Sequence, residues 1–255
     1  MATSPPAQSW AFRPEEVEHS PTRLYSWGML PWITVDQTRT ADGTVLTLAR
    51  RGTEWEVCYD GLVLMSSRVH GSEDELARLA FARVPQARTV LIGGLGLGFS
   101  LRAALDILGP RGKVVVAEQS PSVVDWNRVH VGGLAGRPLE DPRVTVRVGD
   151  VRERIREARA VYDLILLDVD NGPAALIHDA NAGLYDATGI VACHTALKTV
   201  GALAVWAAGP DDRYLRRLQR SGFDASAVRV APRPGAGGRK HVVFLAVKVV
   251  PRRER

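Results

Sequence analysis

The feature that most constrains the fold is a glycine-rich turn between an apolar run and a helical pattern, within residues 88–105. The apolar run ends at Gly93, and Gly94, Gly96 and Gly98 follow in the turn. Glycine has no Cβ and adopts positive φ without strain, so the backbone N–H groups of such a turn approach a ligand closely. A helix that begins directly afterwards adds its positive end. The segment predicts a strand–turn–helix unit that binds a nucleotide-like ligand.

An acid follows this turn at the spacing of nucleoside-binding folds. The next predicted strand, residues 113–118, ends in Glu118, and an acid about twenty residues after such a turn accepts hydrogen bonds from ribose hydroxyls. NAD-type turns usually read G-x-G-x-x-G/A, whereas this turn reads G-x-G-x-G and continues with Phe99. We associate this spacing with S-adenosylmethionine-type proteins, and expect Gln119 at the same site. A tight turn that binds nothing is the alternative.

Composition narrows the class of protein. The 255 residues are 45% hydrophobic and 24% charged, which suits one large domain with a small appendage. No apolar stretch reaches the roughly 18 residues that span a membrane, and the N-terminus lacks a signal pattern, so we expect a cytoplasmic protein that does not bind membranes. Cys58 and Cys193 form neither a disulfide framework nor a metal-binding spacing. The net charge of +5 comes from scattered residues and does not favour nucleic-acid binding.

The chain divides into three regions. Residues 1–22 show little apolar periodicity and are predicted to be a flexible arm. Trp10 and Phe12 of this arm are candidates for docking onto a partner or onto a second subunit of a homodimer. Residues 23–70 alternate between apolar and polar, with Asp-Gly turns, which predicts a small antiparallel β domain. Residues 71–255 begin with a helix and then alternate strands and helices.

The third region is predicted to be an α/β domain with a mostly parallel sheet. The first helix should run from Leu76 to Val84, with Ser72 as its N-cap. Alternating strands and helices indicate right-handed βαβ units. A Pro- and Gly-rich loop joins the last two strands without a helix, so these strands should form a hairpin. Seven strands ending in a hairpin are typical of the Rossmann-like class I methyltransferase fold. The strands are predicted at residues 89–93, 113–118, 144–148, 162–168, 202–207, 227–230 and 241–247, and the helices between them at 99–108, 122–130, 151–160, 183–199 and 212–221.

Together these motifs resemble the spermidine synthase-like (polyamine aminopropyltransferase-like) family of class I S-adenosylmethionine-dependent transferases, over most of the chain. The family's D-P-R-V…G-D segment is matched by residues 141–150, and its fourth strand by residues 162–168. The resemblance implies that Asp150, with Val151 beside it, binds the adenine amino group. It also implies that Asp168 is the catalytic acid.

The sequence departs from the family where substrates bind. The Asp of the family's glycine turn is Leu97 here, which removes the family's discriminator against undecarboxylated S-adenosylmethionine. The family's D-S-S-D motif reads Asp-Val-Asp-Asn, so Asp170 is a candidate for catalysis and substrate binding, and Asn171 for substrate binding. Of the family's Y-Q-E motif only the last acid, Glu75, is kept, and we expect it to bind substrate. His178, in the following loop, is a further candidate for the pocket wall.

Three functions fit these observations. The leading hypothesis is methyl transfer from S-adenosylmethionine to a small-molecule amine or hydroxyl, with Asp168 or Asp170 accepting the proton. The first alternative is aminopropyl transfer from decarboxylated S-adenosylmethionine to a di- or polyamine. The second is a protein that binds an adenosyl ligand without turnover. The structural alternatives for Glu118 and Asp150 are a solvated strand end and a helix N-cap, and for Asp168 cofactor orientation alone.

Overall fold

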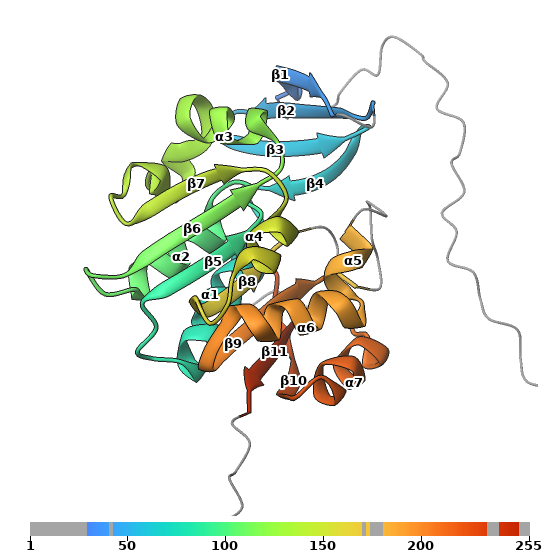
Figure 1. Ribbon diagram of the computed structural model, residues 1–255. Helices are drawn as coiled ribbons and strands as arrows, with labels where there is room; N and C mark the ends of the chain where they lie inside the picture. Colours follow the sequence, from blue (N-terminus) through green and yellow to red (C-terminus); the bar gives the residue numbers. More distant parts are fainter. Residues whose placement is uncertain (1–29, 41–42, 170–171, 174–180, 234–239, 250–255) are drawn as a thin grey trace, which may run out of the picture. The chain divides into compact units, whose positions relative to one another are not determined.

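Four strands near the start of the described chain form an antiparallel meander in the order β1-β2-β3-β4 (Figure 1). The structure is a computed structural model that describes residues 30–40, 43–169, 172–173, 181–233 and 240–249. The strands are β1 (Ile33–Arg39), β2 (Val45–Arg51), β3 (Glu54–Tyr59) and β4 (Leu62–Ser66). At the β3–β4 turn, Asp60 and Gly61 have φ angles of 44° and 80°, as the Asp-Gly pair predicts.

The larger sheet has seven strands in the order β10-β11-β9-β8-β5-β6-β7. The pairs among β5, β6, β7, β8 and β9 are parallel, whereas β11 pairs antiparallel with both β9 and β10. The predicted mostly parallel sheet with a C-terminal hairpin is therefore confirmed. Its strands are β5 (Thr89–Gly93), β6 (Lys113–Glu118), β7 (Val144–Val148), β8 (Tyr162–Leu167), β9 (Leu197–Ala207), β10 (Phe223–Val230) and β11 (His241–Lys248).

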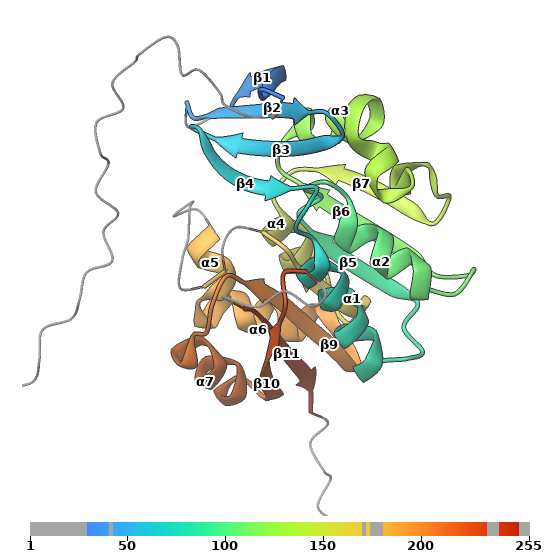
Figure 2. The same ribbon diagram turned by 180° about the vertical axis from the view of Figure 1, so that it is seen from behind.

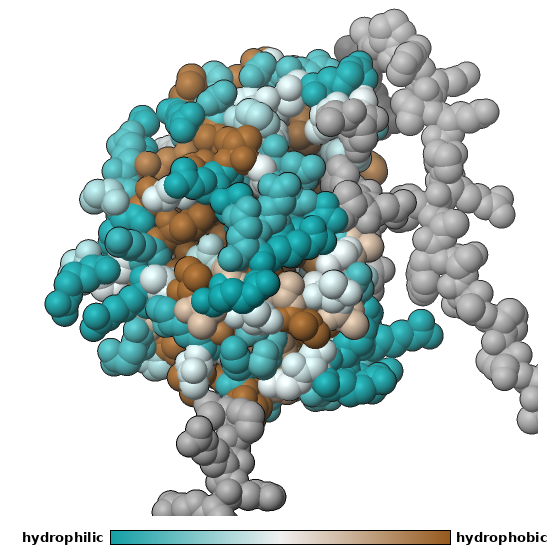
Figure 3. Space-filling model, viewed as in Figure 1, coloured by the Kyte–Doolittle hydropathy of each residue, from teal (hydrophilic) through white to brown (hydrophobic). Residues whose placement is uncertain are grey.

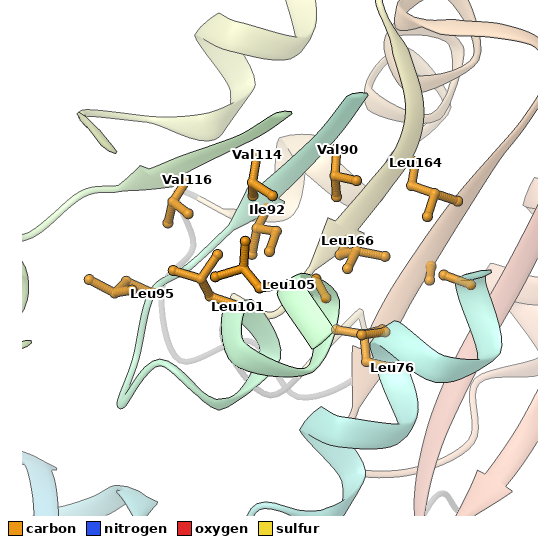
Figure 4. Close-up of a cluster of buried hydrophobic side chains, with 14 of the residues drawn as sticks. Leu76, Val90, Ile92, Leu95, Leu101, Leu105, Val114, Val116, Leu164 and Leu166 are labelled. Carbon is orange, nitrogen blue, oxygen red and sulfur yellow. The ribbon is translucent and has the colours of Figure 1, made fainter. Parts of the chain in front are cut away.

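Helices cover both faces of this sheet, because successive residues of its strands point to opposite sides. Val90 and Ile92 of β5 pack into one cluster with α1 (Gly71–Arg83) and α2 (Phe99–Ile107), as Figure 4 shows. Leu91, between them, joins a second cluster with α4, α6 and α7. Figure 2 shows α1 and α2 in front, and Figure 1 shows α4 and α6 in front. The remaining helices and helical turns are α3 (Pro121–Trp126), the π-helical turn Asn127–Val131, the 3-10 turns Gly132–Ala135 and Pro138–Glu140, α4 (Val151–Glu157), α5 (Ala182–Tyr185), α6 (Ala187–Ala196) and α7 (Asp212–Arg220).

The first helix differs from the sequence prediction at its start. It begins at Gly71 instead of Leu76, and its N-cap is His70, whose side chain makes no capping hydrogen bond. Ser72 is therefore not the N-cap. It lies inside the first turn, where its hydroxyl donates to Glu73. The prediction fails because residues 71–75 were assigned to the segment before the helix, whereas they form its first turn.

The segment predicted as one helix over residues 183–199 is also different. It forms two helices, α5 and α6, separated at Asp186, which caps α6 by accepting a hydrogen bond from the N–H of Gly189. The strand β9 then begins at Leu197, which pairs with Tyr162 of β8. Pairing with the neighbouring strand replaces the helical conformation expected for residues 197–199.

Residues 32–255 group into one compact unit. The predicted division between residues 23–70 and 71–255 does not appear as a separate pair of units, because the two sheets share a hydrophobic cluster. Leu46 and Leu48 of β2 and Val57 of β3 belong to the same cluster as Leu76 of α1. The predicted arm at residues 1–22 lies outside the described residues.

The surface mixes apolar and polar side chains. Figure 3 shows apolar patches between hydrophilic side chains on the face seen in Figure 1, which is ordinary for a folded protein. Within the described part of the chain, no helix combines the length and apolarity needed to cross a membrane.

Candidate active site

The turn between β5 and α2 is built from backbone conformations that glycine adopts most readily. Gly94, Gly96 and Gly98 have φ angles of 87°, 53° and 89°. A Cβ at Gly94 would lie 2.2 Å from the carbonyl oxygen of Asp168, so a side chain there would displace the end of β8. Gly98 is the N-cap of α2, and the turn therefore leads directly into the positive end of that helix.

A cavity of about 800 Å³ lies against this turn, a size that suits a small-molecule site. Its walls come from both sheets and from the loops that follow β5, β6, β7 and β8. Gly98 is not part of the wall, although it shapes the turn. The other described residues that the sequence predicts for the cofactor all line the cavity: Gly94, Gly96, Glu118, Gln119, Asp150, Val151 and Asp168.

Glu118 is held at the end of β6 by backbone donors on both sides. Its Oε2 accepts from the N–H of Leu95 at 2.8 Å, and its Oε1 accepts from the N–H of Ser120 at 2.8 Å. Burial raises the pKa of this carboxyl group, although the backbone hydrogen bonds oppose the shift. Each carboxylate oxygen has two lone pairs, so both keep capacity for a ligand hydroxyl.

Asp150 caps α4 and lines the cavity at the same time. Its carboxylate accepts from the N–H of Arg152 at 2.8 Å and from Nε of Arg152 at 2.7 Å. Burial alone would raise the pKa of Asp150, but the hydrogen bonds and charge of Arg152 hold it below its ordinary value. The N-cap alternative is therefore correct for Asp150, and it is compatible with a ligand contact because the residue also faces the cavity.

Asp168 follows β8 and receives a hydrogen bond from the first turn of α2. Ser100 Oγ donates to Oδ2 of Asp168 at 2.5 Å. Burial raises the pKa of Asp168 to about 6, and the Ser100 hydrogen bond opposes that shift. A carboxyl group with this pKa is ionised above neutral pH and can accept a proton from a reacting group in the cavity.

The acid from α1 that reaches the cavity is Glu73, and this corrects the sequence prediction for Glu75. Glu73 lines the cavity, and burial together with the negative charge of Asp168 raises its pKa to about 7. Glu75 does not line the cavity, and both of its carboxylate oxygens accept from the guanidinium of Arg78. The two acids differ because they point to different sides of one helix.

Sequence reasoning also missed or left open several other residues of the wall. Ser100 and His241 line the cavity without having been singled out for a site. Trp206 also lines the cavity, with its ring centroid 4.7 Å from that of His241. The predicted residues Asp170, Asn171 and His178 lie outside the described residues.

The chain is similar to known proteins in both sequence and structure. No family model matches the chain. In sequence, it is 35% identical over 80 residues to a polyamine aminopropyltransferase of Korarchaeum cryptofilum, covering 31% of this chain and 24% of the relative. It is 27% identical over 127 residues to a polyamine aminopropyltransferase of Bacillus mycoides, covering 49% of this chain and 46% of the relative. The matches thus span less than half of these relatives.

The similarity in structure extends further along the chain. The spermidine synthase of Thermotoga maritima superimposes with a TM-score of 0.71 at 19% identity, covering 92% of this chain and 83% of that one. A spermidine synthase bound to the transition-state analogue AdoDATO gives a TM-score of 0.72 at 18% identity, covering 92% and 84% of the two chains. The chain has the spermidine synthase-like fold. This fold includes both its seven-stranded sheet and its small N-terminal sheet.

This result corrects the leading functional hypothesis. Methyl transfer was preferred because Leu97 replaces the acid of the family's glycine turn, but that interpretation is wrong. The sequence relatives are named polyamine aminopropyltransferases. In the structure, Leu97 is 4% exposed, belongs to the hydrophobic core and also lines the cavity, and Glu73 supplies a carboxylate to the same cavity from another element. The cavity therefore remains acidic although position 97 carries a leucine.

Proposed function

We propose that this protein transfers an aminopropyl group from decarboxylated S-adenosylmethionine to an amine. The names of its sequence relatives support this reaction. The observation that carries it is the acidic character of the cavity. Its described wall contains four carboxyl groups, and Arg39 supplies the positive charge there; the acids are Glu73, Glu118, Asp150 and Asp168.

The charge of the cavity matches the charges of the proposed substrates. Both the sulfonium donor and a protonated amine acceptor are cationic, and buried carboxylates stabilise such groups more than solvated ones do. S-adenosylmethionine carries an additional carboxylate, which the acids of the wall would repel. Removal of this carboxylate leaves a donor that is cationic at both the sulfonium and the amine. We therefore assign decarboxylated S-adenosylmethionine, and not S-adenosylmethionine itself, as the donor.

The reaction requires a nucleophile, a positioned donor and a proton acceptor. Asp168 first accepts a proton from the acceptor ammonium group, which frees the lone pair of its nitrogen. This nitrogen attacks the aminopropyl methylene carbon on the sulfonium sulfur, the bond between that carbon and sulfur breaks, and its electron pair remains on sulfur in methylthioadenosine. The product nitrogen is then a secondary ammonium group. Glu118 and Asp150 hold the nucleoside through its hydroxyl and amino groups, so that the leaving sulfur and the attacking nitrogen are aligned.

The direct test is incubation with decarboxylated S-adenosylmethionine and 1,4-diaminobutane, followed by mass spectrometry. We expect methylthioadenosine and the aminopropylated amine in equal amounts. Asp168→Asn should form both products at least about a hundredfold more slowly. Asp106→Asn should retain activity, because Asp106 is an exposed acid paired with Arg102 on α2. Titration calorimetry should show that the decarboxylated donor binds at least tenfold more tightly than S-adenosylmethionine. Equal or tighter binding of S-adenosylmethionine would contradict the proposal.

A further inference from the structure

A buried hydrogen-bonded chain connects the start of α1 to the start of β11. Ser72, which is fully buried, donates from Oγ to Oε2 of Glu73 at 2.6 Å. The same Oγ lies 2.8 Å from Nδ1 of His241. Ser72 and His241 are 169 positions apart in the sequence, yet the three residues meet beside the cavity. Glu73 and His241 both line that cavity.

The direction of these hydrogen bonds follows from the number of hydrogens available. A serine hydroxyl has a single hydrogen, and Ser72 donates it to Glu73. The contact with His241 is then a hydrogen bond only if Nδ1 of the imidazole carries a proton and donates to Ser72 Oγ. His241 therefore orients Ser72, and Ser72 orients the carboxylate of Glu73.

Two further contacts hold this chain in place. The imidazole of His241 meets the indole of Trp206 edge to face, with ring centroids 4.7 Å apart. The N–H of Gly71, at the first residue of α1, donates to the carbonyl oxygen of Pro232 at 3.0 Å. Contacts from β9 and from the loop before β11 thus hold His241 and the start of α1, and Ser72 connects them to the carboxylate of Glu73.

The carboxylate so presented interacts with the group assigned as the base. The negative charge of Asp168 raises the pKa of Glu73, in addition to the larger effect of burial, and Asp74 adds a smaller contribution of the same sign. Two partly buried carboxyl groups in one cavity repel one another, and the repulsion is relieved when a cation enters between them. A ligand with two positive charges relieves it more completely than a ligand with one.

We propose that Glu73, positioned by Ser72 and His241, is the carboxylate that makes this cavity prefer diamines over monoamines as acceptors. Asp168 accepts the proton from the reacting nitrogen, and Glu73 binds the second ammonium group of the acceptor. This assignment rests on the proposed aminopropyl transfer. Glu73 then contributes chiefly to acceptor binding, and its loss should change KM far more than kcat.

The test compares 1,4-diaminobutane with butylamine, which has the same carbon chain and a single amine. In Glu73→Gln we expect KM for the diamine to rise tenfold or more, with KM for butylamine and kcat for both changed by less than about threefold. The matched control is Glu75→Gln, an acid of the same helix that pairs with Arg78 outside the cavity. It should leave both KM values unchanged.

Ser72→Ala and His241→Gln test the positioning role. Each should raise KM for the diamine and leave butylamine unaffected. In a Glu73→Gln background neither should have a further effect, because the group they orient is gone. A structural defect would instead act on both acceptors and persist in the double variant. Ser72→Ala also answers the question if Glu73→Gln does not fold.

The outcomes separate the two proposals. A wild-type protein that transfers the aminopropyl group, combined with an unchanged diamine KM in Glu73→Gln, would overturn the role of Glu73 alone. An equal rise in KM for both acceptors would overturn it as well. A wild-type protein that forms no methylthioadenosine with any amine would overturn the proposed function, and the assignment of Glu73 with it.

Discussion

Ser100 and Asp168 are joined by a 2.5 Å hydrogen bond between the hydroxyl of the first and Oδ2 of the second. The bond links the first turn of α2 to the end of β8, two elements that meet at the carboxyl edge of the sheet. Ser100 is 3% exposed, and its donor stabilises the ionised form of Asp168 against the effect of burial. The helix that follows the glycine-rich turn therefore also supplies the donor that favours the ionised form of the proposed base.

Asp168→Asn should lose at least about a hundredfold in kcat, which is the lower end of the usual contribution of a general base. Asparagine has nearly the same shape and can still accept the Ser100 hydrogen bond, so the fold should persist. Turnover of decarboxylated S-adenosylmethionine with a diamine measures the loss, and circular dichroism checks the fold. Activity within threefold of wild type would show that Asp168 is not the base.

Ser100→Ala should shift the pH dependence of the reaction. The Ser100 hydrogen bond lowers the pKa of Asp168 from the higher value that burial alone would give, so its removal should raise that pKa above about 6. The acidic limb of kcat/KM should then move to higher pH, while the rate at the alkaline plateau changes little. A pH–rate profile of wild type and variant measures the shift. An acidic limb that does not move would show that Asp168 does not control it.

Glu118→Gln should weaken binding of methylthioadenosine by about tenfold, because a charge-assisted hydrogen bond to the ribose is replaced by a neutral one. The amide NH₂ would also face the N–H of Leu95 or of Ser120, which now donate to the two carboxylate oxygens. Calorimetric titration gives the affinity. Gln119→Ala, at the next position of the wall, provides a comparison that keeps the carboxylate. Unchanged affinity in Glu118→Gln would dismiss the ribose contact.

Glu73→Gln should stabilise the unliganded protein at alkaline pH. The folded-state pKa of Glu73 is about 7, raised from an ordinary value of 4.5. The folded state therefore binds more protons than the unfolded state between these values, and the contribution to stability present below pH 4.5 is lost as the pH rises through about 7.

Glutamine does not ionise, so the difference in Tm between variant and wild type should grow from pH 5 to pH 8. A difference of 1 kcal/mol corresponds to roughly 2–4 °C in a domain of this size. Differential scanning fluorimetry at the two pH values measures it. Glu75→Gln, whose carboxylate lies outside the cavity, should show no such growth. A variant less stable than wild type at pH 8 would contradict the unfavourable burial of Glu73.

Local patterns in the sequence were sufficient for the larger sheet and for most of the predicted residues that line the cavity at its edge. The alternation in β5 and the glycine turn after it are encoded within about ten neighbouring residues, and the acids Glu118 and Asp150 sit at strand ends that apolar runs define. Parallel topology then brings these strand ends to one edge, so their meeting in a cavity follows from the order of elements.

Glu75 was chosen from its match to the last acid of the family's Y-Q-E motif, and the start of the helix was placed too late for its periodicity to correct that choice. With the helix beginning at Gly71, Glu73 is four residues before Ala77 and seven before Ala80, both of which are fully buried. It therefore lies along the face that packs inward, whereas Glu75 lies beside Arg78 on the outside. Helical periodicity extended by one turn would have selected Glu73.

Other features cannot be read from a single sequence at all. No pattern of neighbouring residues in the sequence connects Ser72 with His241, because their contact depends on how the last strand is placed next to α1. Asn127 is similar. Its Nδ2 donates to the carbonyl oxygens of Gly96 and Val123, at 2.8 and 2.9 Å, and so ties the glycine turn to α3. An asparagine in a helical pattern gives no indication of such a partner.

The close packing of Gly94 against the carbonyl oxygen of Asp168 determines which substitutions the site can accept. The distance between the glycine loop, which we propose holds the donor, and the end of β8, where the proposed base lies, is set by backbone touching backbone without any side chain between them. A change of side chain elsewhere in the loop would leave this backbone spacing in place, whereas a side chain at Gly94 would alter it. Selectivity for new amines can accordingly be sought in the surrounding wall, with the glycine at position 94 left untouched.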